Sequence, residues 1–495
     1  MFESAELGHR IDKATYDAEV PRLREALLDA QFDLAKKAGF PVIILVGGLD
    51  GAGRGETVNL LNEWMDPRFI QTHGMGEPSE EEMERPMMWR FWQALPPRGR
   101  IGVFLGSWYT WPILNRAQGH TKDAELVQSL ERARRLEKML TDEGALLIKF
   151  WLHLSKTAQK TRLKSLEKDP RTRWRVTDRD WARYKIYGKL RLIHETVIRH
   201  TSTAEAPWMI VEGSDAHYRS LTVGNMILEA IRKRLNEPDL PPAEIYAPPL
   251  LPSLDKLHIL KTLDLNQKVG KKKYASELEK YQGKLALLTR DPQFAKFTVV
   301  AVFEGNDAAG KGGAIRRVAG ALDARYYQIV PIAAPTEEER AQPYLWRFWR
   351  HIPRRGRFTI FDRSWYGRVL VERVEKFCSE ADWMRAYLEI NDFESQLVRH
   401  NILVVKFWLA ISKDEQLRRF KERENIGFKR FKITEEDWRN REKWDDYERA
   451  VCDMVDRTST EIAPWTLVEA NDKNFARIKI LKTLCQRIEE AIKKQ

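Results

Sequence analysis

The chain has 495 residues, of which 43% are hydrophobic and 32% charged, and its formal net charge is +12 at pH 7. This length exceeds one ordinary hydrophobic core, so the sequence predicts two or three folded domains and excludes a largely disordered chain. It contains no uninterrupted run of about 18 apolar residues, so it predicts no membrane span. The first ten residues lack the basic and apolar regions of a secretory signal.

The net charge and the cysteines indicate the kind of partner and the cellular compartment to expect. The positive net charge indicates an anionic partner, but charge alone does not choose among nucleic acid, a lipid surface, nucleotides or another polyanion. The three cysteines, Cys378, Cys452 and Cys485, lie far apart with no paired spacing. This spacing argues against a disulfide framework or a zinc site and fits a reducing compartment. We therefore expect a cytoplasmic protein without a membrane partner.

The predicted elements begin with an amphipathic helix, in which Tyr16, Val20, Leu23 and Leu27 keep a helical period. A helix of the same kind returns at 274–288. The short apolar strands predicted after it are 297–303, 358–361, 402–411 and 465–468, and the helices predicted between them include one from about Lys311 and one over 383–399. Apolar strands that alternate with helices indicate a parallel sheet covered on both faces.

An offset of 257 residues superimposes the second half of the sequence on the first. The motif WRFW occurs at 89–92 and again at 346–349. Further matched pairs are Gly48 with Gly305, Asp50 with Asp307, Trp108 with Trp365, Lys149 with Lys406 and Trp208 with Trp465, all without a gap. Because this period is far too long for a solenoid, the sequence predicts a tandem domain duplication.

Each copy is predicted to be a P-loop kinase-like domain of three α/β/α layers, with a parallel sheet and a helical lid. We place the N-terminal copy at 1–235, the C-terminal copy at 257–495 and a proline-rich linker at 236–256. Six prolines between Pro238 and Pro252 disfavour a helix or a central strand there and favour an extended connector.

The C-terminal copy carries a phosphate-loop motif directly after its first predicted strand. Residues 305–312 read GNDAAGKG, which fits GxxxxGK. Backbone N–H groups of such a loop surround phosphate oxygens, the following helix N-terminus adds partial positive charge, and Lys311 adds a full charge. The usual Ser or Thr after the lysine is absent, so one ordinary magnesium ligand is missing. The glycines predicted to serve phosphate binding are Gly305, Gly310, Gly312 and Gly313.

Two carboxylates are predicted to hold Mg²⁺ beside this loop. Asp362 ends the apolar strand FTIFD, which is where P-loop enzymes hold a magnesium carboxylate. Asp307, inside the loop, is a second carboxylate for the metal or for the acceptor. Taken alone, Asp362 is also compatible with a simple turn cap.

Arginines are dense around the two motifs, with six arginines and no acidic residue between Arg340 and Arg357. Guanidinium groups bind phosphate oxygens in pairs, and this density exceeds what one nucleoside triphosphate needs. It indicates a track for a longer polyanion, with a solvated basic face as the alternative for each individual arginine. The arginines predicted to bind phosphate are Arg316, Arg317, Arg347, Arg350, Arg354, Arg357, Arg368 and Arg373.

A mobile lid is predicted after the strand that ends near Ile411. Seven basic residues lie between Gln416 and Lys432, against two acidic ones. Lids bring cationic groups onto the phosphates and exclude water. The lid candidates are Lys429, Arg430 and Lys432.

The N-terminal copy lacks several of these groups. Arg54 stands at the position of Lys311, Leu105 at that of Asp362 and Gly106 at that of Arg363, while Glu56 replaces Gly313. Because leucine cannot hold a metal ion and an arginine is lost, we predict that this copy is catalytically silent. Its remaining basic residues leave two roles open, contact with the polyanion or packing against the active copy.

The C-terminal copy resembles the polyphosphate kinase type 2 family. The segments that carry the resemblance are GNDAAGKGG at 305–313, LWRFWRHIPRRGR at 345–357, FDRSWYGRVLVERV at 361–374 and FKRFKIT at 428–434. The resemblance extends through 257–495 and, in degraded form, through the first copy. The fused two-domain form is similar to the polyphosphate:AMP phosphotransferases.

The resemblance implies transfer of the terminal phosphoryl group of inorganic polyphosphate to AMP, with ADP as product and Mg²⁺ as cofactor. It also aligns Asp307, Lys311, Asp362 and Arg363 with the catalytic positions of the family.

Three other activities stay open from the residues themselves. These are polyphosphate-dependent phosphorylation of ADP, an ATP-dependent nucleotide kinase of the same fold, and a non-catalytic module that binds a polyanion or nucleic acid. No nucleic-acid-binding fold signature accompanies the basic charge, so no specific nucleic-acid partner is expected. Base preference, the direction of the reaction and further association of identical chains are not fixed by the sequence.

Overall fold

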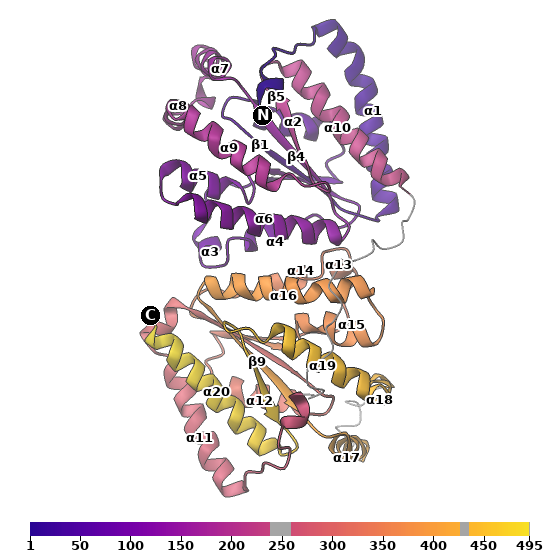
Figure 1. Ribbon diagram of the computed structural model, residues 1–495, viewed down its shortest axis with the longest axis vertical. Helices are drawn as coiled ribbons and strands as arrows, with labels where there is room; N and C mark the ends of the chain where they lie inside the picture. The colour runs from indigo at the N-terminus through magenta and orange to yellow at the C-terminus, as the bar shows by residue number, and fades with distance from the viewer. Residues whose placement is uncertain (238–258, 426–434, 495) are drawn as a thin grey trace. The chain divides into compact units, whose positions relative to one another are not determined.

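The computed structural model describes residues 1–237, 259–425 and 435–494 (Figure 1). They form two compact units, each with its own sheet: Met1–Pro78 with Arg90–Asp239 and Pro335–Trp346, and Ser79–Trp89 with Leu240–Ala334 and Arg347–Gln495. Nearly all of the predicted linker, 236–256, lies outside the described residues. Within the described part, no helix has both the length and the apolar composition required to cross a membrane.

The sheet of the N-terminal copy has five parallel strands in the order β2-β3-β1-β4-β5. The strands are β1 (Val42–Gly48), β2 (Ile70–Gly74), β3 (Ile101–Leu105), β4 (Leu146–His153) and β5 (Trp208–Glu212). The central strand aligns Val42 with Ile101 on one side and with Leu146 on the other. The carboxyl ends of the strands therefore meet at one edge of the sheet.

Helices alternate with these strands. In chain order they are η1 (Glu3–Ala5), α1 (Lys13–Lys37), α2 (Arg54–Trp64), α3 (Glu80–Met83), α4 (Trp89–Gln93), α5 (Thr110–Gln118), α6 (Asp123–Asp142), α7 (Lys156–Lys168), η2 (Arg173–Arg175), α8 (Asp178–Lys185), α9 (Tyr187–Thr201) and α10 (Ala216–Asn236).

The sheet of the C-terminal copy repeats this order as β7-β8-β6-β9-β10, again with every strand parallel. Its strands are β6 (Thr298–Gly305), β7 (Tyr327–Pro331), β8 (Phe358–Asp362), β9 (Ile402–Ala410) and β10 (Trp465–Glu469). In register, Phe303 of β6 lies opposite Asp362 of β8, and Gly305 lies opposite Leu409 of β9. The start of the phosphate loop and the end of β8 are thus neighbours at the carboxyl edge.

The helices of the C-terminal copy follow the same plan. They are η3 (Ile259–Thr262), α11 (Lys271–Leu288), η4 (Pro292–Lys296), α12 (Lys311–Ala319), α13 (Glu337–Arg340), α14 (Trp346–Trp349), η5 (Trp365–Val369), α15 (Val371–Val374), α16 (Glu380–Arg399), α17 (Lys413–Glu424), α18 (Glu435–Glu442), α19 (Trp444–Thr458) and α20 (Lys473–Lys493).

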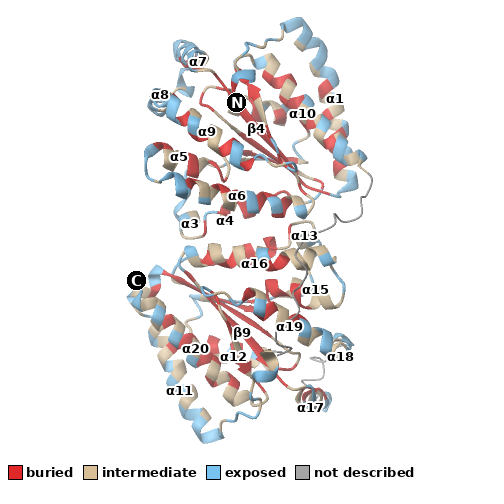
Figure 2. Ribbon diagram, viewed as in Figure 1, coloured by how far each residue is buried: buried red, intermediate tan, exposed pale blue. Residues whose placement is uncertain are grey.

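Helices cover both faces of this sheet. On one face, Leu285 of α11, Val318 of α12 and Leu481 of α20 share a core cluster with Val299 of β6. On the other face, Phe393 of α16 packs edge-on against aromatic rings, with its ring centroid 4.9 Å from that of Trp365. The strands between are buried, as Figure 2 shows. The prediction of a duplicated three-layer α/β/α domain is confirmed.

The two edge strands β2 and β7 were not predicted from the sequence. Gln71 and Thr72 of β2 are exposed, as are Gln328 and Ile329 of β7. A strand at the edge of a sheet needs no continuous apolar run, because only part of its surface is covered. The buried central strands, by contrast, gave a clear apolar signal.

Candidate active site

The phosphate loop occupies the turn between β6 and α12. Gly305 has φ +152°, and a Cβ added there would lie 2.5 Å from the carbonyl oxygen of Leu409. Gly310 is the N-cap of α12 with φ +106°, in the left-handed region that glycine adopts without steric cost. The glycines therefore bring the loop against β9 and direct the first N–H groups of α12 toward the sheet edge.

Lys311 folds back over the loop. Its Nζ atom donates to the carbonyl oxygen of Gly305 at 2.6 Å and to that of Asn306 at 3.3 Å. Desolvation lowers the pKa of Lys311, and the nearby Asp307 carboxylate acts in the opposite direction. The lysine amine is thus held as a hydrogen-bond donor at the centre of the loop.

Asp307 is held from three directions. Its Oδ1 atom accepts from Arg363 Nη2 at 3.4 Å, and its Oδ2 atom accepts from Asn440 Nδ2 at 2.9 Å. Its backbone oxygen accepts from Gln416 Nε2 at 3.2 Å. The carboxylate retains 15% side-chain exposure, so it faces the open part of the site.

Asp362 and Arg363 stand where β8 ends. The backbone N–H of Arg363 donates to the carbonyl oxygen of Phe303 at 3.0 Å, which continues the pairing with β6. Arg363 has φ +64°, a left-handed conformation that costs a non-glycine residue on the order of 1 kcal/mol or more. Such a conformation at an arginine is a local strain that points to a use for the side chain.

A buried carboxyl lies behind the loop. Glu304 is 5% exposed and accepts a hydrogen bond from Ser364 Oγ at 2.8 Å. Burial raises the pKa of Glu304, against the influence of Lys311. The sequence analysis did not single out this residue, although the N-terminal copy has Gly47 in its place.

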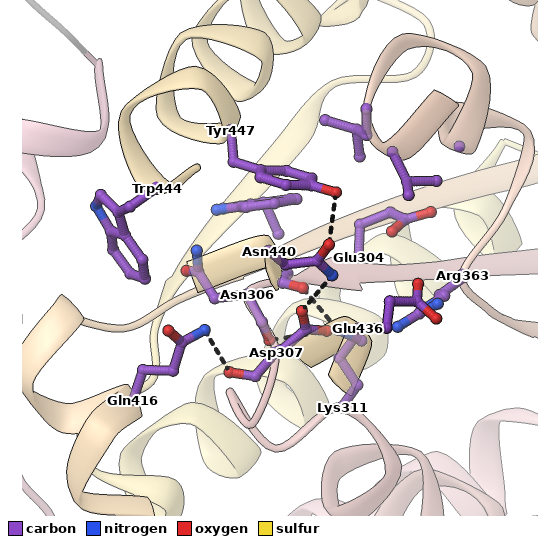
Figure 3. A pocket seen from close by; sticks show the side chains of 15 residues that line it. Glu304, Asn306, Asp307, Lys311, Arg363, Gln416, Glu436, Asn440, Trp444 and Tyr447 are labelled. Carbon is purple, nitrogen blue, oxygen red and sulfur yellow. Dashed lines mark hydrogen bonds and ion pairs between the residues drawn. The ribbon is translucent and has the colours of Figure 1, made fainter. Parts of the chain in front are cut away.

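Most of these groups, but not Asp362, line one pocket of about 670 Å³, a volume that includes its opening to solvent (Figure 3). One part of its lining is polar, with Asp307, Lys311 and Arg363, and another part is aromatic, with Trp444 and Tyr447. The remaining lining residues are Glu304, Gly305, Asn306, Gly367, Leu370, Val371, Trp408, Gln416, Glu436 and Asn440. The pocket thus offers phosphate-binding groups next to a flat apolar surface.

The predicted residues are therefore only partly brought together. Gly305, Asp307, Lys311 and Arg363 line the pocket. Asp362 lies one strand away from the loop, and its carboxylate acts electrostatically on Lys311 and Glu304. Gly312 and Gly313 lie in the first turn of α12, directly after Lys311.

Several of the predicted arginines have protein partners. Arg347 Nη2 donates to the carbonyl oxygen of Ala333 at 3.0 Å, and Arg317 Nη1 donates to that of Gly313 at 3.2 Å. The ion pairs among the rest are Arg354 with Glu84, Arg368 with Glu372 at 3.2 Å, and Arg373 with Asp453 at 2.7 Å. Arg357 donates to the carbonyl oxygen of Arg325. Arg316 lies in α12 and Arg350 directly after α14, and phosphate binding by all eight arginines stays a prediction. The lid candidates Lys429, Arg430 and Lys432 lie outside the described residues.

Sequence reasoning missed the residues that approach the pocket from α18 and α19. Asn440, Trp444 and Tyr447 lie beyond the predicted lid and belong to no phosphate motif. The sequence contained one signal that could have found them, namely that all three residues differ between the copies. The matching positions of the N-terminal copy hold Arg183, Tyr187 and Leu190. Differences between the copies, more than shared residues, mark the pocket lining.

The N-terminal copy fills the same place with ion pairs. Asp50 Oδ1 accepts from Arg54 Nη2 at 2.6 Å and from Arg183 Nη1 at 3.2 Å. Glu56 accepts from three arginines: Arg162 Nη2 at 2.7 Å, Arg175 Nη1 at 3.0 Å and Arg219 Nη2 at 2.8 Å. The cations around this loop are thus bound to the protein's own carboxylates.

The geometry of the C-terminal copy defines the class of protein. A glycine loop between a buried strand and a helix, a lysine folded over it and an aspartate at the end of the adjacent strand make a P-loop phosphotransferase site. The family is also shown, because the family model described as Polyphosphate kinase 2 (PPK2) matches residues 10–238 and 268–495. The chain belongs to this family, and the resemblance and the phosphotransferase activity predicted from the sequence are confirmed.

The chain is similar over all or nearly all of its length to two polyphosphate:AMP phosphotransferases. It is 61% identical to a polyphosphate:AMP phosphotransferase of Pseudomonas aeruginosa, with 100% of both chains covered. It is 38% identical to a polyphosphate:AMP phosphotransferase of Acinetobacter johnsonii, with 93% of this chain and 94% of the relative covered. A crystal structure of a polyphosphate kinase 2 from Pseudomonas aeruginosa superimposes with a TM-score of 0.91 and 58% identity, and all of both chains is covered.

Proposed function

We propose that the C-terminal copy transfers the terminal phosphoryl group of inorganic polyphosphate to AMP, giving ADP, and that the N-terminal copy does not catalyse this step. The observation that carries the proposal is the difference between the two loops. Lys311 and Arg363 line a pocket beside Asp362, whereas Leu105 stands in place of that aspartate and Gly106 in place of that arginine. The acceptor is inferred from the full-length relatives, which are polyphosphate:AMP phosphotransferases.

The loop and its lysine bind the end of the donor. Backbone N–H groups at the start of α12 point to the carboxyl edge of the sheet, where anionic oxygens are stabilised by the helix terminus. Lys311 exchanges its two carbonyl partners, Gly305 and Asn306, for phosphate oxygens. An ammonium group that is shielded from solvent binds a phosphate more strongly than one in water, because the local dielectric constant is lower.

Mg²⁺ is the metal ion that fits this site. Asp307, in the pocket lining, and Asp362, at the end of the adjacent strand, are the carboxylates that would hold it, and Glu304 and Glu436 also line the pocket. Residues 1–237, 259–425 and 435–494 contain no group of three or more His, Cys, Asp or Glu that could enclose a metal. Two carboxylates suit a hard cation that completes its shell with phosphate oxygens and water. When bound, such an ion neutralises phosphate charge during the transfer.

The remaining residues position the acceptor and balance charge. The AMP phosphate is already anionic, so it attacks in line with little need for a base, and Asp307 would orient it by holding the cation between the two anionic groups. Arg363, whose side chain is 44% exposed, reaches the pocket and stabilises charge on the transferred group. The transfer is direct and requires no covalent enzyme intermediate.

The test is a product assay with purified protein, Mg²⁺ and long-chain polyphosphate, in which AMP, ADP or GMP is supplied separately. We expect ADP only when AMP and polyphosphate are both present, as resolved by anion-exchange chromatography. Formation of ATP from ADP, without ADP from AMP, would overturn the acceptor. Transfer from ATP in place of polyphosphate would overturn the donor.

A further inference from the structure

A short hydrogen-bonded chain connects α19 to the phosphate loop. The hydroxyl of Tyr447 donates to Asn440 Oδ1 at 3.1 Å, and Asn440 Nδ2 donates to Asp307 Oδ2 at 2.9 Å (Figure 3). A carboxylate can only accept, so the nitrogen of the Asn440 amide must face Asp307 and its oxygen must face the tyrosine hydroxyl. The Asp307 carboxylate thereby selects the amide orientation, and the Tyr447 hydroxyl supplies the donor for the amide oxygen on the other side.

The N-terminal copy has different residues at both positions of this chain. Arg183 stands in place of Asn440, and Leu190 stands in place of Tyr447. Arg183 Nη1 lies 3.2 Å from Asp50 Oδ1 and 3.3 Å from Oδ2, and Arg54 Nη2 lies 2.6 Å from Oδ1. Two guanidinium groups therefore contact the loop aspartate of the copy that we propose to be silent.

The position of α18 does not depend on Asn440. Arg439 Nε and Lys443 Nζ contact Glu375 Oε2, at 3.0 and 2.8 Å, and the Glu375 side chain is 4% exposed. Arg441 Nη1 donates to the carbonyl oxygen of Lys413 at 2.5 Å. These contacts hold the C-terminal half of α18 without the Asn440 amide, so the amide can serve a purpose other than holding the helix.

We propose that Asn440, whose amide oxygen is held by the Tyr447 hydroxyl, is a positioning residue that fixes the Asp307 carboxylate with a neutral donor and so preserves its negative charge for a cation in the site. Arg363 approaches the same carboxylate, but at 3.4 Å and from the opposite oxygen. A second guanidinium at position 440 would cancel the charge and compete with a metal ion for Asp307. This inference rests on the proposed function of the C-terminal copy.

The experiment compares wild type with Asn440→Arg, Asn440→Ala and Tyr447→Phe. We expect kcat to fall at least about 100-fold in Asn440→Arg and about 10-fold in Asn440→Ala, and about 3-fold in Tyr447→Phe, since a single hydrogen bond contributes on the order of 1 kcal/mol. In Asn440→Arg the half-saturating Mg²⁺ concentration should rise about 10-fold, while the KM for AMP stays within 2-fold in Tyr447→Phe.

The second readout does not use activity. Mg²⁺ is titrated against the Tm of each protein in the presence of tripolyphosphate and the absence of AMP, because a bound ion stabilises the fold by mass action. The Mg²⁺ concentration that gives half of the Tm increase should be about 10-fold higher in Asn440→Arg than in wild type. Asn391→Ala is the matched control, because Asn391 Nδ2 donates to the carbonyl oxygen of Arg457 at 2.9 Å and does not line the pocket.

The outcomes separate this inference from the proposed function. If wild type forms ADP and Asn440→Arg matches it within 2-fold in kcat and in both Mg²⁺ titrations, the positioning role is excluded and the proposed function stands. If wild type forms no ADP, the proposed function fails, and the Tm titration still decides the inference. A shift in Asn391→Ala as large as that in Asn440→Arg would also overturn it.

Discussion

The two copies have the same strand order but differ at the carboxyl edge of the sheet. Four of the fifteen pocket positions carry the same residue in both copies, as Gly305 and Gly48, Asp307 and Asp50, Trp408 and Trp151, and Gln416 and Gln159. Among the shared residues, the two glutamines hold the backbone of the loop: Gln159 Nε2 donates to the carbonyl oxygen of Asp50 at 3.0 Å, and Gln416 Nε2 donates to that of Asp307 at 3.2 Å. The two loops therefore share their backbone support but differ in most of the side chains that line the pocket.

Two of the positions that differ between the copies carry a charged residue in the C-terminal copy and a glycine in the N-terminal copy. At the carboxyl edge of the C-terminal sheet, Arg363 is left-handed and Glu304 is buried. In the N-terminal copy the same places hold Gly106, with φ +87°, and Gly47, and the carboxylates have internal partners. Strained and uncompensated groups usually persist where a function requires them. The comparison therefore supports the proposal that the C-terminal copy carries the chemistry.

The largest effect should come from the aspartate that only the C-terminal copy has. Asp362→Asn removes a carboxylate charge at the predicted metal position, so we expect ADP formation to fall roughly 10⁴-fold, or about 5.5 kcal/mol in the barrier. Asp50→Asn, in the other copy, should change it less than about 2-fold. The assay is the AMP and polyphosphate reaction. Comparable losses from both substitutions would break the assignment of catalysis to one copy.

A smaller loss of activity should follow when Arg363, which has a left-handed backbone, is replaced by the glycine that the N-terminal copy has at this position. Arg363→Gly removes a charge-balancing guanidinium, so we expect kcat to fall about 10³-fold, or about 4 kcal/mol. The fold should not suffer, because glycine adopts the φ of +64° without steric cost. Thermal unfolding should show a Tm equal to or slightly above that of wild type. A large decrease in Tm would mean that the arginine is structural.

The sequence predicted the parts of the site that lie in local motifs. The residues of the loop and Asp362 follow apolar strands directly, so their place at the sheet edge could be derived from chain order. Asn440 could not be placed in this way, because it lies 133 residues from Asp307 in the chain and its role depends on a tertiary contact. Charge density was also insufficient, since it does not show that Arg373 pairs with Asp453.

A buried Lys–Glu ion pair occurs at the same position in both copies, so breaking it should lower stability equally in each. This tests the comparison at residues that the copies share. Lys406 Nζ contacts Glu394 Oε2 at 2.8 Å, and Lys149 Nζ contacts Glu137 Oε2 at 2.7 Å, in fully buried pairs. Glu394→Gln and Glu137→Gln each leave a buried ammonium without its counterion, at a cost of about 3 kcal/mol or more. Both should lower the Tm by similar amounts.

Unequal effects would locate a functional role in one of these pairs. If Glu394→Gln lowered kcat per folded molecule while Glu137→Gln did not, the buried cluster of the C-terminal copy would take part in the reaction. We expect kcat per folded molecule to stay within about 2-fold in both variants, because neither glutamate lines the pocket. Circular dichroism melting and the ADP assay on the same samples give the two quantities.

The smallest effect concerns the carboxylate that stands in place of a loop glycine. Glu56→Gln removes the shared counterion of Arg162, Arg175 and Arg219, so these guanidinium groups repel one another. Because the Glu56 side chain is 31% exposed, solvent screens part of this repulsion, and we expect a loss of about 1–2 kcal/mol in stability. ADP formation should remain unchanged, and higher salt should reduce the loss, since screening weakens like-charge repulsion. A Tm equal to that of wild type at low salt would show that the three arginines do not need this carboxylate as a counterion. The arginines around the N-terminal loop would then be available to bind an external anion.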